Sequence, residues 1–242
     1  MVAAKRWIDR REFARKITAA WFGAWAIARD ASAQQQRGRA ISPFDGKTLD
    51  GWLQLENRPA DPPVPGWVAK EGVMASTGRG RGVIYTSGDY ARFRLMFTMR
   101  HVSGTPDHQA CVLIFCTRPV GDEKPLDALG GIQFQVPNGG HWDYRPGNNT
   151  DGGAEFKRLV NPQFDPHAWS RVEILADAAT GRARMAVAQP PESKAVEVLD
   201  FVDATAGKAG PIAWQMHNAG LFDEYKDVSI EIDPKEDRLV TI

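Results

Sequence analysis

The chain has 242 residues, with 30 lysines and arginines against 30 aspartates and glutamates, so its formal net charge is zero. This balance excludes a nucleic-acid binder that acts through a broad basic field. The 43% of hydrophobic and 25% of charged residues are typical of a folded protein and exclude a disordered one. No run of 18 apolar residues occurs, which excludes an ordinary membrane-spanning helix.

The first 33 residues have the organisation of an export signal. Six basic side chains in the first 16 residues precede an apolar stretch at 17–28, and an Ala-Ser-Ala cleavage pattern ends at Ala33. The adjacent Arg10 and Arg11 predict the twin-arginine variety, and hence a periplasmic or secreted protein that uses the twin-arginine export machinery. The alternative is an amphipathic first helix of the domain. The polar residues 34–40, expected to be a linker, favour the signal.

Removal of residues 1–33 changes the charge balance. These residues hold seven basic and three acidic side chains, so the remaining 209 residues carry 23 basic and 27 acidic groups, or −4. A mildly anionic exported domain is a poor partner for nucleic acid or for anionic lipid. No membrane span is expected after cleavage of the signal.

From residue 66 onward, apolar residues alternate with polar ones in the period of two that is typical of β-strands. The alternation is clearest in five runs: 93–100, 132–136, 171–177, 212–217 and 228–233. About ten strands in about 200 residues, with no dividing linker, predict one all-β sandwich of two antiparallel sheets. We expect this domain over residues 41–233 and a C-terminal tail at 234–242.

Two cysteines flank a predicted buried strand, Cys111 at its start and Cys116 after its end. Five positions apart, they would point to opposite faces and lie roughly 16 Å apart along a strand. A disulfide needs Cα atoms within about 7 Å of each other. The spacing therefore predicts two free, buried thiols.

Two segments rich in proline or glycine, residues 58–65 and 139–153, are predicted to be long loops, where function is often found. Within the second, residues 148–151 read Asn-Asn-Thr-Asp and offer oxygen ligands that suit calcium, although without the EF-hand spacing. Ordinary turn chemistry is the alternative for these residues.

Long neutral polar side chains occur in two of the predicted strands, as Gln133, Gln135 and Gln215. An amide both donates and accepts hydrogen bonds, which suits sugar hydroxyls. Trp142 and Tyr144 follow in the adjacent loop, and their rings suit stacking on the apolar face of a pyranose. A concave sheet face with these groups would form a saccharide cleft. The alternative is a solvated outer face with ordinary polar residues.

The histidines lack the tight spacing of a local metal site, so any divalent metal must be held by residues far apart in the sequence. Its identity and ligands remain open. A lone histidine commonly makes structural hydrogen bonds, and this is the expected role of His101 and His167. His108, His141 and His217 are better functional candidates because each adjoins another polar or aromatic candidate.

The segment Pro43 to Trp52 resembles the opening signature Leu-Phe-Asn/Asp-Gly-Lys-x-Leu-x-Gly-Trp of the 3-keto-disaccharide hydrolase domain family. Residues 67–72, 169–174 and 210–217 are similar to three further segments of that family. The resemblance covers roughly residues 41–233. It implies a concanavalin A-like jelly roll, in agreement with the sandwich predicted from the strand pattern.

The resemblance also implies a reaction, the cleavage of a glycoside whose sugar is oxidised at C3. The ketone acidifies the C2 proton, so that a base can remove this proton and expel the aglycone from C1. Water then adds to the enone in a hydrolase, whereas a lyase stops before this addition. The reaction needs a base near C2, a group that polarises the C3 oxygen and an acid for the leaving group.

The chain departs from the family pattern at two places. His108 to Ile114 stands where the family commonly has Asn-Ser-Gly-x-x-x-Arg, and Ile132 to Gln135 stands where it commonly has Tyr-Glu-x-Gln. Gln133 thus replaces a carboxylate, and an amide cannot replace a carboxylate as a proton acceptor.

A histidine can supply the missing base. We therefore expect His217 to be the base and His108 or His141 to assist as acid or metal ligand. The sugar would be oriented by the amides and rings named above: Gln133, Gln135, Gln215, Trp142 and Tyr144. The alternative, motivated by Gln133, is a non-catalytic, lectin-like saccharide-binding module.

Overall fold

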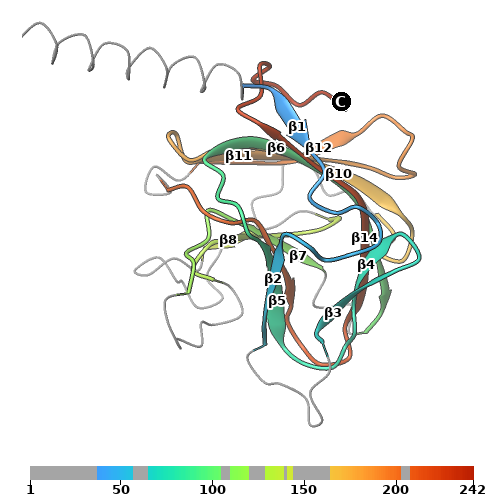
Figure 1. Cartoon of the computed structure of the whole chain (residues 1–242). Helices are drawn as coiled ribbons and strands as arrows, with labels where there is room; N and C mark the ends of the chain where they lie inside the picture. The colour runs from blue at the N-terminus through green and yellow to red at the C-terminus, as the bar shows by residue number, and fades with distance from the viewer. Residues whose placement is uncertain are drawn as a thin grey trace, which may run out of the picture.

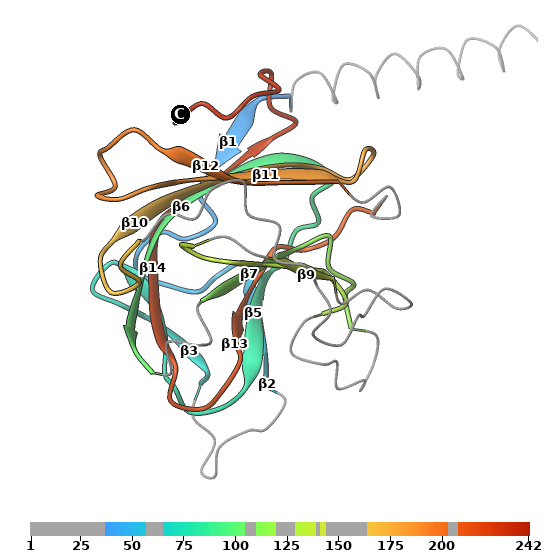
Figure 2. The same cartoon turned by 180° about the vertical axis from the view of Figure 1, so that it is seen from behind.

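The structure of the protein is a computed structural model. It describes residues 37–56, 65–104, 110–119, 129–138, 164–202 and 208–242, and residues 141–143 by their backbone alone. The described residues form fourteen strands in two sheets, with antiparallel pairing throughout. The predicted all-β sandwich of two antiparallel sheets is therefore confirmed (Figures 1 and 2).

Sheet A has eight strands in the order β12-β11-β10-β6-β14-β4-β3, and β1 pairs with β14 as well. Its strands in chain order are β1 (Arg39–Ile41), β3 (Trp67–Lys70), β4 (Val73–Ser76), β6 (Arg92–Ser103), β10 (Ser170–Asp177), β11 (Arg182–Ala188), β12 (Val196–Val202) and β14 (Phe222–Ile232).

Sheet B has six strands in the order β2-β5-β13-β7-β8-β9. Its strands in chain order are β2 (Trp52–Glu56), β5 (Gly82–Thr86), β7 (Cys111–Ile114), β8 (Ile132–Gln135), β9 (His141–Asp143) and β13 (Ala213–Met216). In Figure 1, the sheet A strands β6, β10, β11 and β12 lie above the sheet B strands β7 and β8.

The core lies between the sheets and follows the alternation seen in the sequence. Alternate residues of β6, from Phe93 to Met99, are at most 1% exposed and meet the inner residues of sheet B. Trp214 on β13 lies at the centre, with its ring centroid 5.5 Å from that of Phe97 and 5.4 Å from that of Tyr225. Burial of each such side chain contributes about 1.5–3 kcal/mol, so this contact holds the sheets together.

The segment that resembles the family signature forms the turn into β2. Asp45 Oδ1 accepts hydrogen bonds from the backbone N–H of Lys47 at 2.8 Å and of Thr48 at 2.7 Å, and these bonds lower the pKa of Asp45. The Trp52 indole then donates to the Pro43 carbonyl at 2.8 Å. The signature residues thus shape an entry turn, and their role here is structural.

The outer face of sheet A carries ion pairs and is overlaid by residues 234–242. Arg94 and Glu173 form a buried pair at 2.9 Å. Glu173 also accepts hydrogen bonds from the backbone N–H groups of Val240 and Thr241, at 3.0 Å each. Leu239 is 1% exposed. The tail is therefore packed onto the sandwich.

Both cysteines are free and buried, as predicted. The expectation of one long loop at 139–153 is corrected by β9, because His141–Asp143 pairs with β8. The calcium candidate at 148–151 and the leader at 1–33 lie outside the described residues. Within the described ranges, no helix is long and apolar enough to cross a membrane.

Candidate functional site

The outer face of sheet B, which points away from sheet A, brings three of the predicted residues together. The register pairs Gln215 on β13 with Cys111 on β7, and Cys111 with Gln135 on β8. Gln133 lies two residues before Gln135 and hence on the same face. The three glutamines and Cys111 form what we call the amide face.

The amide face is buried. Gln133 and Gln215 are 2% exposed, Cys111 is 3% exposed and Gln135 is 5% exposed. The alternative of a solvated outer face is therefore wrong. Buried amides need hydrogen-bond partners, and Gln133 Oε1 has none among the described residues.

The rest of the same sheet face is apolar. Val83, Tyr85, Leu113 and Ala213 pack with Leu129 and Cys116 in a small cluster of their own, separate from the core between the sheets. Burial raises the pKa of the Tyr85 hydroxyl and of the Cys116 thiol. The face thus combines neutral polar groups with apolar ones.

His217 follows β13 directly, two residues beyond Gln215, and is half-buried. Its Nδ1 lies 3.1 Å from Asn218 Oδ1. If Nδ1–H donates to this oxygen, Nε2 is the unprotonated nitrogen of the neutral ring, which is the form that accepts a proton. The structure thus places a histidine at the end of the strand that carries Gln215.

Of the other predicted site residues, the structure describes the backbone of His141 and Trp142 only. Trp142 pairs with Gln133 across β8 and β9, whereas His141 pairs with Phe134, one position out of register with the glutamines. His108 and Tyr144 lie outside the described residues. The structure thus brings Gln133, Gln135 and Gln215 together and puts the backbone of Trp142 beside them.

A buried histidine–aspartate pair was not anticipated from the sequence. His101 Nδ1 lies 2.8 Å from Asp223 Oδ1, and the two residues are 2% and 1% exposed. His101 continues the apolar alternation of Phe93 to Met99, which is the signal that it faces inward. Its partner comes from a strand 122 positions away, and no local pattern reveals that pairing.

Each member of this pair affects the other's titration. The hydrogen bond to Asp223 raises the pKa of His101, and burial raises the pKa of Asp223. His167 Nδ1 approaches the His101 carbonyl oxygen at 2.9 Å. Both histidines therefore make the structural hydrogen bonds expected of them.

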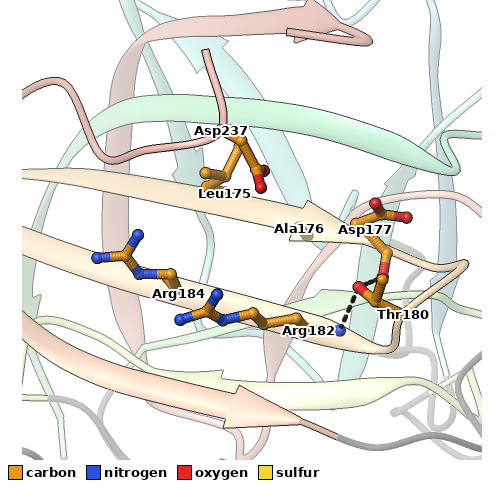
Figure 3. Close-up of a pocket in the computed structure, with 7 residues that line it drawn as sticks. All are labelled: Leu175, Ala176, Asp177, Thr180, Arg182, Arg184 and Asp237. Carbon is orange, nitrogen blue, oxygen red and sulfur yellow. Dashed lines mark hydrogen bonds between the residues drawn. The ribbon is translucent and has the colours of Figure 1, made fainter.

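No clustered set of metal ligands is formed within the part of the chain that the structure describes. There, no group of three or more His, Cys, Asp or Glu side chains is arranged to hold a metal ion. A cavity of ≈ 130 Å³ on the outer face of sheet A is lined by Arg182, Arg184 and Asp237 among others (Figure 3). The arginines pair with Asp200 and Glu197, so their charge is already balanced.

The sequence of residues 39–231 matches a known family, the 3-keto-alpha-glucoside-1,2-lyase-like domain. The chain belongs to this family. The match covers nearly all of the sandwich, which agrees with the resemblance seen in the opening signature. A comparison with curated protein sequences gives no match.

Solved structures of similar fold include a candidate glycosyl hydrolase from Parabacteroides distasonis ATCC 8503, with TM-score 0.53 and 16% identity over 80% of this chain and 93% of that one. The carbohydrate binding module CBM66 from Bacillus subtilis has TM-score 0.53 and 12% identity over 75% and 95%. The VIP36 exoplasmic/lumenal domain in its Ca2+/Man-bound form has TM-score 0.56 and 6% identity over 85% and 93%. These likenesses establish a concanavalin A-like fold for this member of the lyase-like family.

Proposed function

We propose that this protein is a carbohydrate-active enzyme that cleaves 3-keto-glycosides, including 3-keto-disaccharides, by removal of the C2 proton. The observation that carries the proposal is the amide face, where Gln133, Gln135 and Gln215 share one buried sheet face. Family membership supplies the reaction class. The face is neutral, which suits a neutral sugar.

In this proposal, His217 removes the C2 proton through Nε2, and hydrogen bonding to Asn218 holds the ring. The three glutamines orient the sugar hydroxyls, and Trp142 and Tyr144 stack on the ring. An acid for the leaving group, or a metal ligand, would come from His108 or His141. The carboxylate pair of ordinary glycosidases is not needed, because the C3 ketone makes the C2 proton acidic.

One assay separates the possible activities. The protein without its leader is incubated with 3-keto-sucrose, 3-keto-trehalose and a 3-keto-β-glucoside, with and without a chelator. Both activities release the aglycone, because both break the bond at C1. Formation of the free 3-keto sugar alongside the aglycone indicates a hydrolase, and accumulation of an enone indicates a lyase. Absence of product from all three substrates would contradict the enzyme proposal.

The role of His217 is tested by His217→Ala. Loss of a general base lowers turnover by about 100-fold or more. The matched control is His167→Ala, which removes an exposed histidine that contacts the His101 carbonyl and should retain activity. Turnover in His217→Ala equal to that of the wild type would remove His217 from the mechanism.

The second candidate is a non-catalytic saccharide-binding module. It is favoured by Gln133, an amide where the family resemblance places a carboxylate, and by the fold shared with a carbohydrate binding module and with a mannose-bound lumenal domain. It predicts heat of binding with glycans in calorimetry and no product from any 3-keto sugar.

We further propose that the protein is exported to the periplasm or beyond by the twin-arginine machinery, on the basis of Arg10, Arg11 and the pattern that ends at Ala33. Replacement of both arginines by lysine should retain the protein in the cytoplasm. Cell fractionation measures this, and unchanged export would contradict it.

A further inference from the structure

Cys111 and Gln133 contact each other on the amide face. The register pairs Cys111 with Gln135 and Leu113 with Gln133, so this contact runs diagonally across β7 and β8. Gln133 Nε2 donates to Cys111 Sγ at 3.0 Å. Because the two side chains are 2% and 3% exposed, the hydrogen bond is made away from water.

This hydrogen bond determines which end of the Gln133 amide is offered to a ligand. Nε2 carries the donors of the amide, and Oε1 is its acceptor. With Nε2 held by the thiol, Oε1 is left for another partner, and it has none among the described residues. A buried oxygen without a hydrogen bond costs about 1–3 kcal/mol, which a donor on a ligand would offset.

We propose that Cys111 is a positioning residue that holds Gln133 with its Oε1 presented to a hydroxyl group of the sugar. The inference rests on the proposed function and narrows it. The substrate must carry a hydroxyl at this point, because a ketone oxygen or a carboxylate has no proton to donate. The C3 ketone is therefore bound elsewhere on the face.

The second cysteine is a matched control. Cys116 is 1% exposed and packs in the apolar cluster with Val83, Tyr85 and Leu113. The two thiols thus share burial and differ in surroundings, since Cys111 contacts an amide. Cys111→Ala removes the contact, Cys111→Ser restores a hydrogen-bonding atom, and Cys116→Ala removes the other thiol.

The first measurement needs no ligand. Solvent exchange of the Gln133 side-chain amide protons is followed by NMR, with the signal assigned by its loss in Gln133→Leu. Exchange should be about 2- to 12-fold faster in Cys111→Ala, the range of one hydrogen bond, and close to wild type in Cys111→Ser and Cys116→Ala. Equal exchange in the wild type and Cys111→Ala would overturn the positioning role.

The second measurement uses methyl 3-keto-glucoside and its 2-, 4- and 6-deoxy analogues, with KM and kcat from turnover and Kd from calorimetry. Cys111→Ala should raise KM or Kd about 2- to 12-fold, with kcat within about twofold. One of the deoxy analogues should bind the wild type more weakly than the parent sugar does. In Gln133→Leu, removal of the same hydroxyl should cause little further loss of affinity. An equal loss for that analogue in both proteins would overturn the assignment of a hydroxyl to Gln133.

The two measurements separate the two hypotheses. If no sugar is bound or converted, the proposed function fails, while the exchange rates still decide whether Cys111 holds Gln133. If sugars are converted but Cys111→Ala matches the wild type in exchange and in KM, only the positioning role fails.

Discussion

The outer faces of the two sheets differ in how their polar groups are satisfied. On sheet A, arginines and carboxylates alternate between strands, as in the pairs Arg94–Glu173 and Arg182–Asp200, and the C-terminal tail accounts for further hydrogen bonds. On sheet B, the corresponding face carries neutral amides and a thiol, and Gln133 Oε1 has no partner within the described ranges. The outer face of sheet A, which we call the ion-pair face, is held mainly by charge pairs, although Arg171 Nε is buried there without a hydrogen bond to the described residues. The amide face of sheet B is neutral and retains capacity for a ligand.

This difference shows that the presence of a surface cavity is a poor guide to function here. The cavity in Figure 3 lies on the ion-pair face, and the two arginines that line it, Arg182 and Arg184, each already have a carboxylate partner. A ligand there would have to displace an existing ion pair. On the amide face, a ligand would instead satisfy Gln133 Oε1, which burial has removed from water.

The largest expected effect concerns the ion-pair face of sheet A. Glu173→Ala removes one of the two carboxylates that pair with the buried Arg94, Glu231 being the other, and it frees the tail. The free energy of unfolding should therefore fall by up to about 3–5 kcal/mol. Denaturant unfolding measures this. The control Asp200→Ala, in a partly exposed pair, should cost no more than about 1 kcal/mol. Similar losses in the two variants would contradict the contrast between them.

The second prediction concerns pH and the pair His101–Asp223. The pKa of each residue is higher in the folded state than in the unfolded state. Each residue therefore stabilises the fold at low pH, and this stabilisation is lost as the pH rises through the folded-state pKa. Relative to the double variant His101→Gln, Asp223→Asn, the wild type should lose stability above pH about 6.5, by up to about 1.4 kcal/mol per pH unit. Urea midpoints from pH 6 to 9 test this, and a rise with pH would refute it.

The third prediction tests the amide face by itself. Gln215→Leu should weaken saccharide binding about 2- to 12-fold, because the amide that would bind a sugar hydroxyl is lost. Gln54→Leu is the control, since that amide binds the Trp67 backbone on the other side of sheet B. Calorimetry should detect weaker binding in Gln215→Leu alone.

The smallest expected effect is that of salt. Because the amide face is neutral, affinity for a neutral sugar should change less than about twofold between 0.05 and 0.5 M NaCl, although the screening length shortens severalfold. Titration calorimetry at the two concentrations measures this. A tenfold fall in affinity would mean that charged groups bind the ligand.

Much of the fold could be read from the sequence, because a strand with one buried face must alternate. The runs around Phe97, Ile174 and Ile230 predicted strands that the structure contains, and five-residue spacing predicted two free thiols at Cys111 and Cys116. The same rule put Gln133 and Gln135 on one face. The signature that begins at Pro43 indicated the family to which the chain belongs.

Only the tertiary structure decided which strands are neighbours, because strand order depends on contacts between distant segments. It placed Gln215 beside Cys111 and Gln135, and it paired His101 with Asp223. It also showed that the amide face is buried. Alternation cannot reveal this burial, because it assigns residues to the two faces of a strand without showing what covers each face. The sequence by itself thus determined the residues of the face, and the packing of the sheets determined that those residues meet and are removed from water.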